Sequence, residues 1–408
     1  MGAIRSDVVI AGGGMVGLTL AIALARGGLQ VAVADPMTVE QMGDERFDGR
    51  VAALAFASVR MLRVLGLWQR LEGEAQPIND ILVNESAAGR GPSPFSLHFD
   101  HREIGEPLGH IVENRHIRKA LLAEIAAEKR IRFFPGTSAT KLAVREGLAR
   151  IALSDGSEIA APLAVAAEGR ESALREAQGI GITGWDYGQT GIVTTVVHER
   201  PHHGVAYEQF LPTGPFAILP MTGNRASLVW TEEASQARRL LALPEAPFTA
   251  ELIRRFGTHL GEVNPIGPRW SYPLRLHLAR SYVKDRFALV GDAAHTIHPL
   301  AGQGLNLGLK DVAALTETLL DAARLGLDYG QLDVLERYER WRRFDSFVLA
   351  VATDSLNRLF SNDFPPLKLA RELGMGVVDR IAPLRKLFMR HAGGDLGVLP
   401  RLLKGEAA

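Results

Sequence analysis

Cysteine is absent from this chain of 408 residues, which excludes disulfide bonds, thiolate nucleophiles and thiolate metal sites. An excess of positive charge is also absent: 46 basic residues balance 46 acidic ones, so no overall field favours nucleic acid as a partner. Lysine is scarce, with 8 residues against 38 arginines, a bias that we interpret as GC-rich bacterial coding. The 47% hydrophobic and 23% charged residues are typical of a soluble globular protein. The chain is too long for one ordinary core, so two packed domains are expected.

One apolar stretch near the N-terminus is long enough to suggest a transmembrane helix, because residues 8–34 contain a single charge, Arg26. Glycines cluster inside this stretch, where a strand would pass into a helix, and no basic segment flanks it. We therefore expect neither a transmembrane helix nor a secretory signal here.

Residues 6–35 instead have the pattern of a complete βαβ unit. An apolar strand leads into a G-x-G-x-x-G sequence, a helix without breakers follows, and a second apolar strand ends at Asp35. The acid follows the glycines by about 20 residues, as dinucleotide sites require, and its carboxylate can accept a hydrogen bond from a ribose hydroxyl. The pattern therefore predicts a dinucleotide site.

Each part of the glycine loop has a predicted role. Gly12 allows the tight turn after the strand, Gly14 lets the backbone approach a pyrophosphate, and Gly17 lets the helix pack closely on the sheet. Met15 and Val16 lie between these glycines, and the helix that follows directs its free N–H groups and dipole at the phosphates.

A second glycine-rich stretch follows an apolar strand at 287–290. It reads GDAAH at 291–295 and GQGLN at 302–306, before a helix from about residue 307. The succession of strand, acid, glycine loop and helix start predicts a second anion site at a helix N-terminus. Asp292 is either a hydrogen-bond acceptor for a ligand hydroxyl or a turn former.

The rest of the chain alternates between helical and strand patterns. Helical periodicity at 51–67 places Arg50 at a helix start near the predicted phosphate site, and it returns at 111–129 and after residue 312. Short alternating runs predict a largely antiparallel sheet. These runs lie at 80–84, 95–99, 192–198, 206–211, 216–221 and 226–231.

The two glycine stretches resemble those of the single-component FAD aromatic hydroxylases of the para-hydroxybenzoate hydroxylase type. The sequence is more similar still to the ubiquinone-biosynthesis flavin hydroxylases, over nearly the whole chain. Besides GGGMVG at 12–17 and GDAAH at 291–295, the resemblance is carried by residues 112–115, 211–215, 302–308 and 358–362.

The resemblance implies FAD as cofactor, NAD(P)H as reductant, and dioxygen and a prenylated phenolic quinone precursor as substrates. In the family's cycle, reduced FAD forms a C4a-hydroperoxide that transfers one oxygen atom to the phenolic ring. The implied FAD contacts, besides the first loop, are Arg50, Asn114, Asp292, Gly304, Leu305 and Asn306. One departure from the family pattern is Glu168, which with Gly169 replaces the usual Asp-Gly pair.

The group that activates the phenol is left open by the sequence. Tyr207, Tyr272 and His298 are candidates, and Pro299 is expected to shape the pocket beside the flavin through its backbone. His295 and His298 are three residues apart, but no third ligand accompanies them. We therefore predict no metal site, and we expect His295 to pack or to form a hydrogen bond near the flavin.

The predicted architecture is α/β. A Rossmann-like FAD-binding domain is interleaved with an antiparallel β-sheet substrate domain and is followed by a helical C-terminal region. The predicted bounds are 1–78, 113–189 and 284–345 for the FAD-binding domain, 79–112 and 190–283 for the substrate domain, and 346–408 for the C-terminal region.

The C-terminal region is both basic and apolar, with nine basic and five acidic residues from Arg358 onward. It can pack on the core, join a quinone-biosynthesis protein complex, or lie on anionic lipid. We expect a cytoplasmic protein with peripheral contact at the inner face of the cytoplasmic membrane. Two other functions stay open: a flavin-retaining scaffold in a quinone-biosynthesis assembly, and a flavin epoxidase or reductase acting on an isoprenoid chain.

Overall fold

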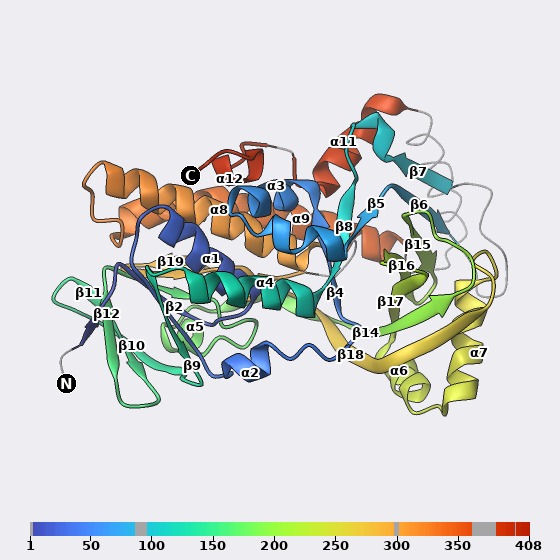
Figure 1. Cartoon of the computed structure of the whole chain (residues 1–408), viewed down its shortest axis with the longest axis horizontal. Helices are drawn as coiled ribbons and strands as arrows, with labels where there is room; N and C mark the ends of the chain where they lie inside the picture. The colour runs from blue at the N-terminus through green and yellow to red at the C-terminus, as the bar shows by residue number, and fades with distance from the viewer. Residues whose placement is uncertain (1–2, 86–95, 298–301, 361–380, 396) are drawn as a thin grey trace.

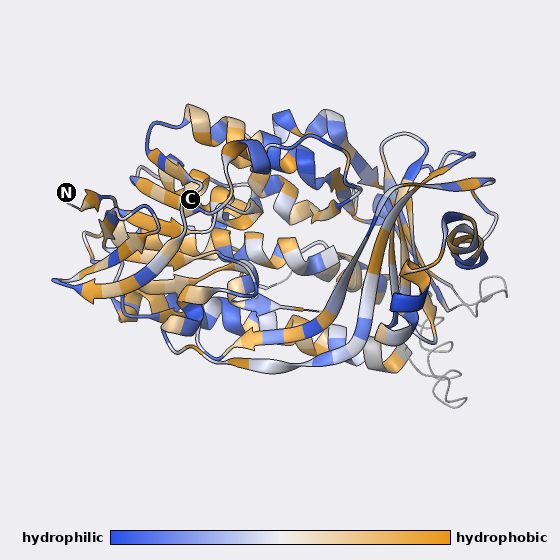
Figure 2. Ribbon diagram, turned by 90° about the horizontal axis from the view of Figure 1, so that it is seen from below, coloured by the Kyte–Doolittle hydropathy of each residue, from blue (hydrophilic) through white to orange (hydrophobic). Residues whose placement is uncertain are grey.

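The computed structural model describes residues 3–85, 96–297, 302–360, 381–395 and 397–408. Figure 1 shows two sheet-containing halves at the ends of the long axis, with helices α8 (Gln303–Arg324) and α9 (Leu332–Phe360) along one side. Two long strands, β14 (Ile182–His198) and β18 (Val263–Ala279), connect the halves. Both termini lie in the half that contains the parallel sheet (Figures 1 and 2).

This half is built on a six-stranded sheet in the order β19-β20-β13-β2-β3-β9. Strands β2 (Val8–Ala11) and β3 (Val31–Asp35) are parallel and buried, because each is a short, mostly apolar run, and helix α1 (Met15–Arg26) connects them. The predicted βαβ unit is confirmed. The other strands are β9 (Ile131–Pro135), β13 (Leu163–Ala166), β19 (Val283–Lys284) and β20 (Phe287–Leu289).

The structure also contains two smaller sheets. In the first, β11 and β12 pair antiparallel and are joined by a turn at Asp155 and Gly156. Its strands are β1 (Ile4–Arg5), β10 (Ala139–Arg145), β11 (Leu148–Leu153) and β12 (Glu158–Ala161). The second sheet contains β4 (Val51–Ala55), β5 (Ala75–Ile78) and β8 (Gly109–Glu113).

The helix predicted at 51–67 is wrong in its first part. Strand β4 comes first, and helix α3 (Phe56–Val64) begins only after it. Strand β4 pairs with β8 along its whole length, and this nonlocal ladder overrides the helical periodicity of the segment. Arg50 therefore precedes a strand rather than a helix. The helix predicted from residue 111 likewise starts after β8, as α4 (Asn114–Ala127).

The other half is built on an eight-stranded sheet in the order β21-β18-β14-β17-β16-β15-β6-β7. The predicted antiparallel arrangement is confirmed except between β15 and β6, which are parallel. One face packs on α6 (Ala234–Leu241) and α7 (Glu245–Phe256) through a core that includes Phe216, Trp230 and Phe248. The remaining bounds are β6 (Asp80–Glu85), β7 (Ser96–Asp100), β15 (Val205–Leu211), β16 (Gly214–Met221), β17 (Arg225–Glu233) and β21 (His295–Thr296).

Figure 2 shows hydrophobic residues concentrated in the half that contains the parallel sheet. The C-terminal part is helical where it is described, as predicted, whereas the proline pair at 365–366 lies outside the described residues. Pro383 lies in the first turn of α11, where proline is tolerated.

Within the described ranges, no helix has the length and apolar character needed to cross a membrane. The remaining helices are α2 (Val39–Met42), α5 (Ala173–Ala177), α11 (Ala382–Ala392) and α12 (Arg401–Lys404), with 3₁₀ turns at Trp68–Arg70, Glu72–Glu74, His101–Glu103 and Gly291–Ala293.

Candidate functional site

The glycines of the first loop are of two kinds. Gly12 has a φ of 107°, and a Cβ there would lie 2.4 Å from the carbonyl oxygen of Ala167. A Cβ on Gly17 would lie 2.0 Å from the carbonyl oxygen of Gly12, so packing requires both glycines. Gly14 differs, because its φ is −69° and an added Cβ would meet no atom within 4 Å. The loop therefore leaves open space at Gly14, as the close approach of a ligand requires.

Helix α1 begins beside that open space. Gly14 is its N-cap, without a side-chain cap, and its first turn contains no acidic residue. The first intrahelical hydrogen bond runs from the N–H of Leu18 to the carbonyl oxygen of Gly14 at 2.9 Å. The N–H groups of Met15, Val16 and Gly17 precede this bond and, with the helix dipole, form an anion site.

Asp35 ends β3 next to the loop and is 8% exposed. Its Oδ2 accepts a hydrogen bond from the N–H of Gly13 at 2.6 Å, and its Oδ1 accepts one from the N–H of Met37 at 2.8 Å. The carboxylate therefore holds the glycine loop and the turn after β3 in place. The predicted ribose contact would be an additional role, for which the remaining lone pairs leave capacity.

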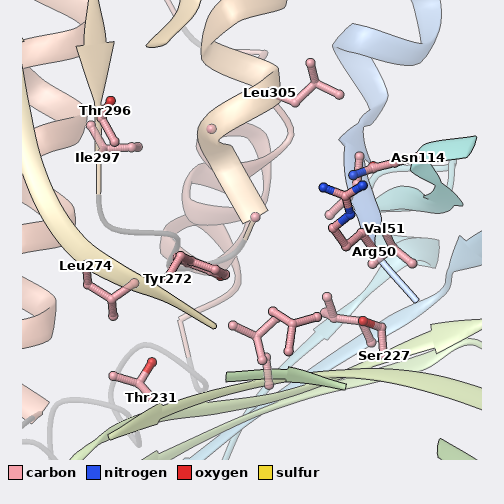
Figure 3. Close-up of a pocket in the computed structure, with 18 of the residues that line it drawn as sticks. Arg50, Val51, Asn114, Ser227, Thr231, Tyr272, Leu274, Thr296, Ile297 and Leu305 are labelled. Atoms are coloured by element: carbon pink, nitrogen blue, oxygen red, sulfur yellow. The ribbon is translucent and has the colours of Figure 1, made fainter. Parts of the chain in front are cut away.

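A cavity of about 320 Å³ lies between the glycine loops and the eight-stranded sheet, on the face of the sheet that does not pack on α6 and α7. Figure 3 shows Arg50 and Asn114 on one wall, Ile297 on another, and Ser227 and Thr231 on the sheet below. Of the predicted site residues, those that line the cavity are Met15, Arg50, Asn114, Asp292, Gly304 and Leu305. The fold thus brings both glycine stretches to one place.

Arg50 and Asn114 are held together by a hydrogen bond from the N–H of Asn114 to the carbonyl oxygen of Arg50 at 2.9 Å. The guanidinium of Arg50 pairs with Asp48 at 2.7 Å and lies 4.9 Å from the centroid of the Trp270 ring. The side-chain oxygen of Asn114 is buried and has no hydrogen-bond partner among the described residues. A buried acceptor in this position fits a donor supplied by a ligand.

Asp292 and the N-terminus of α8 form the facing wall. Gly302, with a φ of 64°, is the N-cap of α8, so the N–H groups of Gly304 and Leu305 lie in its unpaired first turn. Burial raises the pKa of Asp292, and the charge of His295 partly offsets that effect. The wall therefore offers one acceptor and several backbone donors.

The side chain of Asn306 has a structural role, so its predicted FAD contact stays a prediction for the backbone. Its Oδ1 accepts hydrogen bonds from the N–H of Ala55 at 2.9 Å and from Ser58 Oγ at 2.8 Å. Its Nδ2 donates to the carbonyl oxygen of Ala53 at 2.8 Å. The side chain thus clamps α8 to β4 and α3, which leaves only the backbone N–H for a cofactor contact.

A buried charge network holds the second glycine stretch in place. Asp311 on α8 accepts hydrogen bonds from the N–H of Gly291 at 2.8 Å, from His295 Nε2 at 2.6 Å and from Arg342 Nε at 2.7 Å. Burial opposes ionisation, but the charges of His295 and Arg342 hold the pKa of Asp311 below its usual value. The predicted hydrogen-bonding role of His295 is confirmed. Asp311 and Arg342 were not predicted from the sequence, where the only indication of them is a charge on the apolar face of a helix.

Comparison with known proteins identifies the family. The FAD binding domain family matches residues 5–344. Ubiquinone hydroxylase UbiL of Rhodospirillum rubrum is 51% identical over 405 residues, which cover 98% of this chain and 93% of that protein. The chain belongs to the ubiquinone-biosynthesis flavin hydroxylases.

Two further similarities agree with this assignment. The 3-demethoxyubiquinol 3-hydroxylase of Escherichia coli is 35% identical to this flavin hydroxylase over 394 residues, covering 95% of the chain and 98% of that protein. The crystal structure of p-nitrophenol 4-monooxygenase PnpA from Pseudomonas putida matches with a TM-score of 0.79 at 18% identity, covering 98% of this chain and 100% of that one, and so shares its fold.

FAD is therefore the cofactor of this flavin hydroxylase, and NAD(P)H is its reductant. Three observations show that the site residues fit FAD. Two helix N-termini without side-chain caps meet at the site, Gly14 has open space around it, and the buried oxygen of Asn114 lacks a donor among the described residues. The resemblance inferred from the sequence is confirmed.

The three residues that the sequence offered as candidates for phenol activation do not lie together in the structure. Tyr272 lines the cavity, and burial raises its pKa to about 12. Tyr207 packs on the opposite face of the sheet, with its ring 4.5 Å from that of His259, so the expectation for Tyr207 is not met. His298 and Pro299 lie outside the described residues. The described part of the chain contains no group of three His, Asp or Glu side chains arranged to hold a metal.

Glu168 caps the short helix α5. Its Oε2 accepts hydrogen bonds from Ser172 Oγ at 2.6 Å and from the N–H of Leu174 at 3.1 Å. Arg170, two residues later, lines the cavity. Glu208 also lines the cavity and was not predicted from the sequence. The only indication of it there is an acidic residue in a strand that is otherwise uncharged.

Proposed function

We propose that this flavin hydroxylase adds one oxygen atom to the aromatic ring of a prenylated phenolic precursor of ubiquinone. The observation that carries the proposal is the composition of the cavity floor. Its apolar positions are Val193, Pro215, Ala217, Leu219 and Val229. An apolar floor opposite the cofactor loops suits an aromatic ring, with a few polar groups left to orient it. The similarity to a ubiquinone hydroxylase supports the same substrate class.

Residues on two walls of the cavity would hold FAD. The N-terminus of α1 would bind the pyrophosphate, Asp292 would accept a hydrogen bond from a ribityl hydroxyl, and the N–H groups of Gly304 and Leu305 would donate to the flavin ring. Arg50 and Asn114 would contact the cofactor from the opposite wall. When bound and reduced by NAD(P)H, FAD supplies the oxygen-activating chemistry. The apolar floor would keep water away from the reacting atoms.

The test is turnover of a short substrate analogue, 2-prenylphenol, by the holoenzyme. NAD(P)H consumption should depend on the phenol, and mass spectrometry should find one added oxygen on the ring. A flavin-retaining scaffold would bind FAD but show no phenol-dependent consumption. An epoxidase would place the oxygen on the prenyl chain. Either of these two results would contradict the proposed hydroxylation.

We further propose a peripheral contact with the inner face of the cytoplasmic membrane, as the apolar tail of such a substrate would require. Helix α9 supports this idea, because it exposes four apolar side chains at helical spacing i, i+3, i+4 and i+7. These are Phe344 (73% exposed), Phe347 (56%), Val348 (39%) and Val351 (48%). Arg340 and Arg343, which flank this face, are also exposed. Amphipathic helices with basic and aromatic residues bind anionic lipid surfaces in this way.

Further along the chain, Ile381 just before α11 and Leu387 and Phe388 on α11 are also exposed apolar side chains. Flotation with vesicles of phosphatidylcholine and phosphatidylglycerol would test the contact at low salt. The double variant F344E/F347E should lose binding, and removal of the residues after Pro383 should weaken it. Leu325→Glu, at an exposed apolar site at the end of α8, is the matched control and should bind as the wild type does. Equal flotation of all variants, or none by the wild type, would contradict the contact.

A further inference from the structure

A single acidic side chain lies in the apolar floor of the cavity. Glu208 is on β15, where the register places it beside Val83 on β6 and beside Ala217 on β16. The next strands continue the same cross-strand row with Val229 and Val193. Glu208, Ala217, Val229 and Val193 all line the cavity. The row is therefore apolar except for one carboxyl group.

The surroundings of Glu208 do not satisfy its charge. Among the described residues, Glu208 has no hydrogen bond or ion pair, and burial raises its pKa to about 7. The strands on either side contribute Val83 and Ala217, which carry no charge. The other charged or titratable side chains that line the cavity are Arg50, Arg170, Tyr272, Arg275 and Asp292. A carboxyl group without a charged or hydrogen-bonding partner in an apolar environment destabilises the fold when it ionises. Such groups are typical of functional sites.

We propose that Glu208 is the catalytic base that accepts the phenolic proton of the substrate during ring hydroxylation. This inference rests on the proposed function. A phenol placed on the apolar floor would direct its hydroxyl group toward the single acidic group of that floor. The carboxylate form of Glu208 is an acceptor only, so it would bind the hydroxyl through a charge-assisted hydrogen bond.

In the proposed step, the ring carbon ortho or para to the hydroxyl forms a bond to the transferred oxygen while the O–O bond of reduced dioxygen breaks. The phenolic O–H bond breaks, its electron pair forms a ring carbonyl, and the proton passes to Glu208. The C–H proton then passes to the departing second oxygen atom, which restores the aromatic ring, and Glu208 returns its proton to the ring oxygen. With one further proton the second oxygen atom leaves as water, and NAD(P)H supplies the two electrons.

Tyr272 has a complementary role in this arrangement. Its pKa of about 12 keeps the hydroxyl protonated, so it can donate a hydrogen bond to a bound ligand but does not act as the base near neutral pH. Glu208 is the better base there, because general bases work best with a pKa near the working pH.

The first test measures binding and needs no turnover. The oxidised holoenzyme is titrated with 2-prenylphenol and with its methyl ether, which has no proton to donate. The preference of the wild type for the phenol should rise about tenfold as the pH rises through about 7, since the carboxylate forms there. Glu208→Gln should show no such rise. A pH-dependent preference that survives in Glu208→Gln would overturn the assignment.

The second test measures turnover. The wild-type hydroxylation rate should rise with pH through about 7, and Glu208→Gln should lose about a hundredfold in rate and show no rise at that pH. Glu208→Asp should restore the pH dependence in part, and Tyr272→Phe should keep it. If the wild type fails to hydroxylate 2-prenylphenol, the proposed function fails. If it succeeds and Glu208→Gln matches its rate and pH profile, only the role of Glu208 fails.

Discussion

Gly14 offers a way to disturb the cofactor site without disturbing the fold. Its φ of −69° is accessible to any residue, and an added Cβ would meet no atom within 4 Å. Replacing glycine by alanine at a compatible position stabilises a protein by about 0.4–1 kcal/mol through the unfolded chain. The loss of glycine as an N-cap offsets roughly the same amount. We therefore expect Gly14→Ala to leave the free energy of unfolding of the apoprotein nearly unchanged.

The effect on FAD should be much larger. The new methyl group would stand where the pyrophosphate has to approach the N–H groups of α1. Loss of one charge-assisted hydrogen bond there costs about 1.5–3 kcal/mol, which corresponds to roughly ten- to hundredfold weaker FAD binding. Wild-type protein should purify yellow, with noncovalent FAD, and Gly14→Ala should purify pale or colourless.

The assay combines thermal unfolding of the apoprotein with FAD titration by flavin fluorescence. Gly12→Ala is the matched control, because its Cβ would lie 2.4 Å from the carbonyl oxygen of Ala167 and its φ is 107°. This variant should lower the Tm of the apoprotein itself. If Gly14→Ala binds FAD as tightly as the wild type, the account of the open space at Gly14 is refuted.

Three other variants test the second loop and the cavity. Asp292→Ala should weaken FAD binding about ten- to hundredfold in titrations, and unchanged affinity would make Asp292 only a turn former. Arg342→Met should lower the Tm by an amount equivalent to about 3–5 kcal/mol, because it leaves buried Asp311 without one of its partners. The loss should shrink in acid, where protonation of Asp311 removes the unpaired charge, and a pH-independent loss would argue against this cause. Glu208→Gln should raise the Tm at pH 8 but not at pH 4, because a carboxyl with its pKa raised to about 7 destabilises the fold only above the pKa of the unfolded chain, by up to about 3 kcal/mol above pH 7. An equal Tm for Glu208→Gln and the wild type at pH 8 would show that the carboxyl is not strained.

The βαβ unit could be predicted from the sequence because its determinants are local. The apolar strands, the glycine spacing and Asp35 lie within 30 consecutive residues, and each has one structural use. The start of β4 could not be predicted in this way. Its partner β8 follows more than 50 residues later, and only their pairing shows that residues 51–55 form a strand.

The same reasoning explains the results for the candidate site. Gly14 and Asp292 belong to contiguous motifs and were predicted, whereas the clamp formed by Asn306 connects atoms 248 and 251 positions apart in the chain. Arg342 and Glu208 were missed, because a charge on a buried helix face or sheet face is informative only once the neighbours are known. The side of the sheet on which Tyr207 lies depends on strand register, which the sequence pattern left open.

The central claim is that the chain transfers one oxygen atom from dioxygen to the ring of a prenylated phenol. It is tested most directly by supplying the holoenzyme with NAD(P)H, 2-prenylphenol and isotopically heavy dioxygen, and by analysing the product by mass spectrometry with fragmentation. We expect one heavy oxygen atom on the ring for each NAD(P)H that is consumed in the presence of the phenol. Three results would contradict ring hydroxylation. They are a product without heavy oxygen, heavy oxygen on the prenyl chain, and NAD(P)H consumption that does not depend on the phenol.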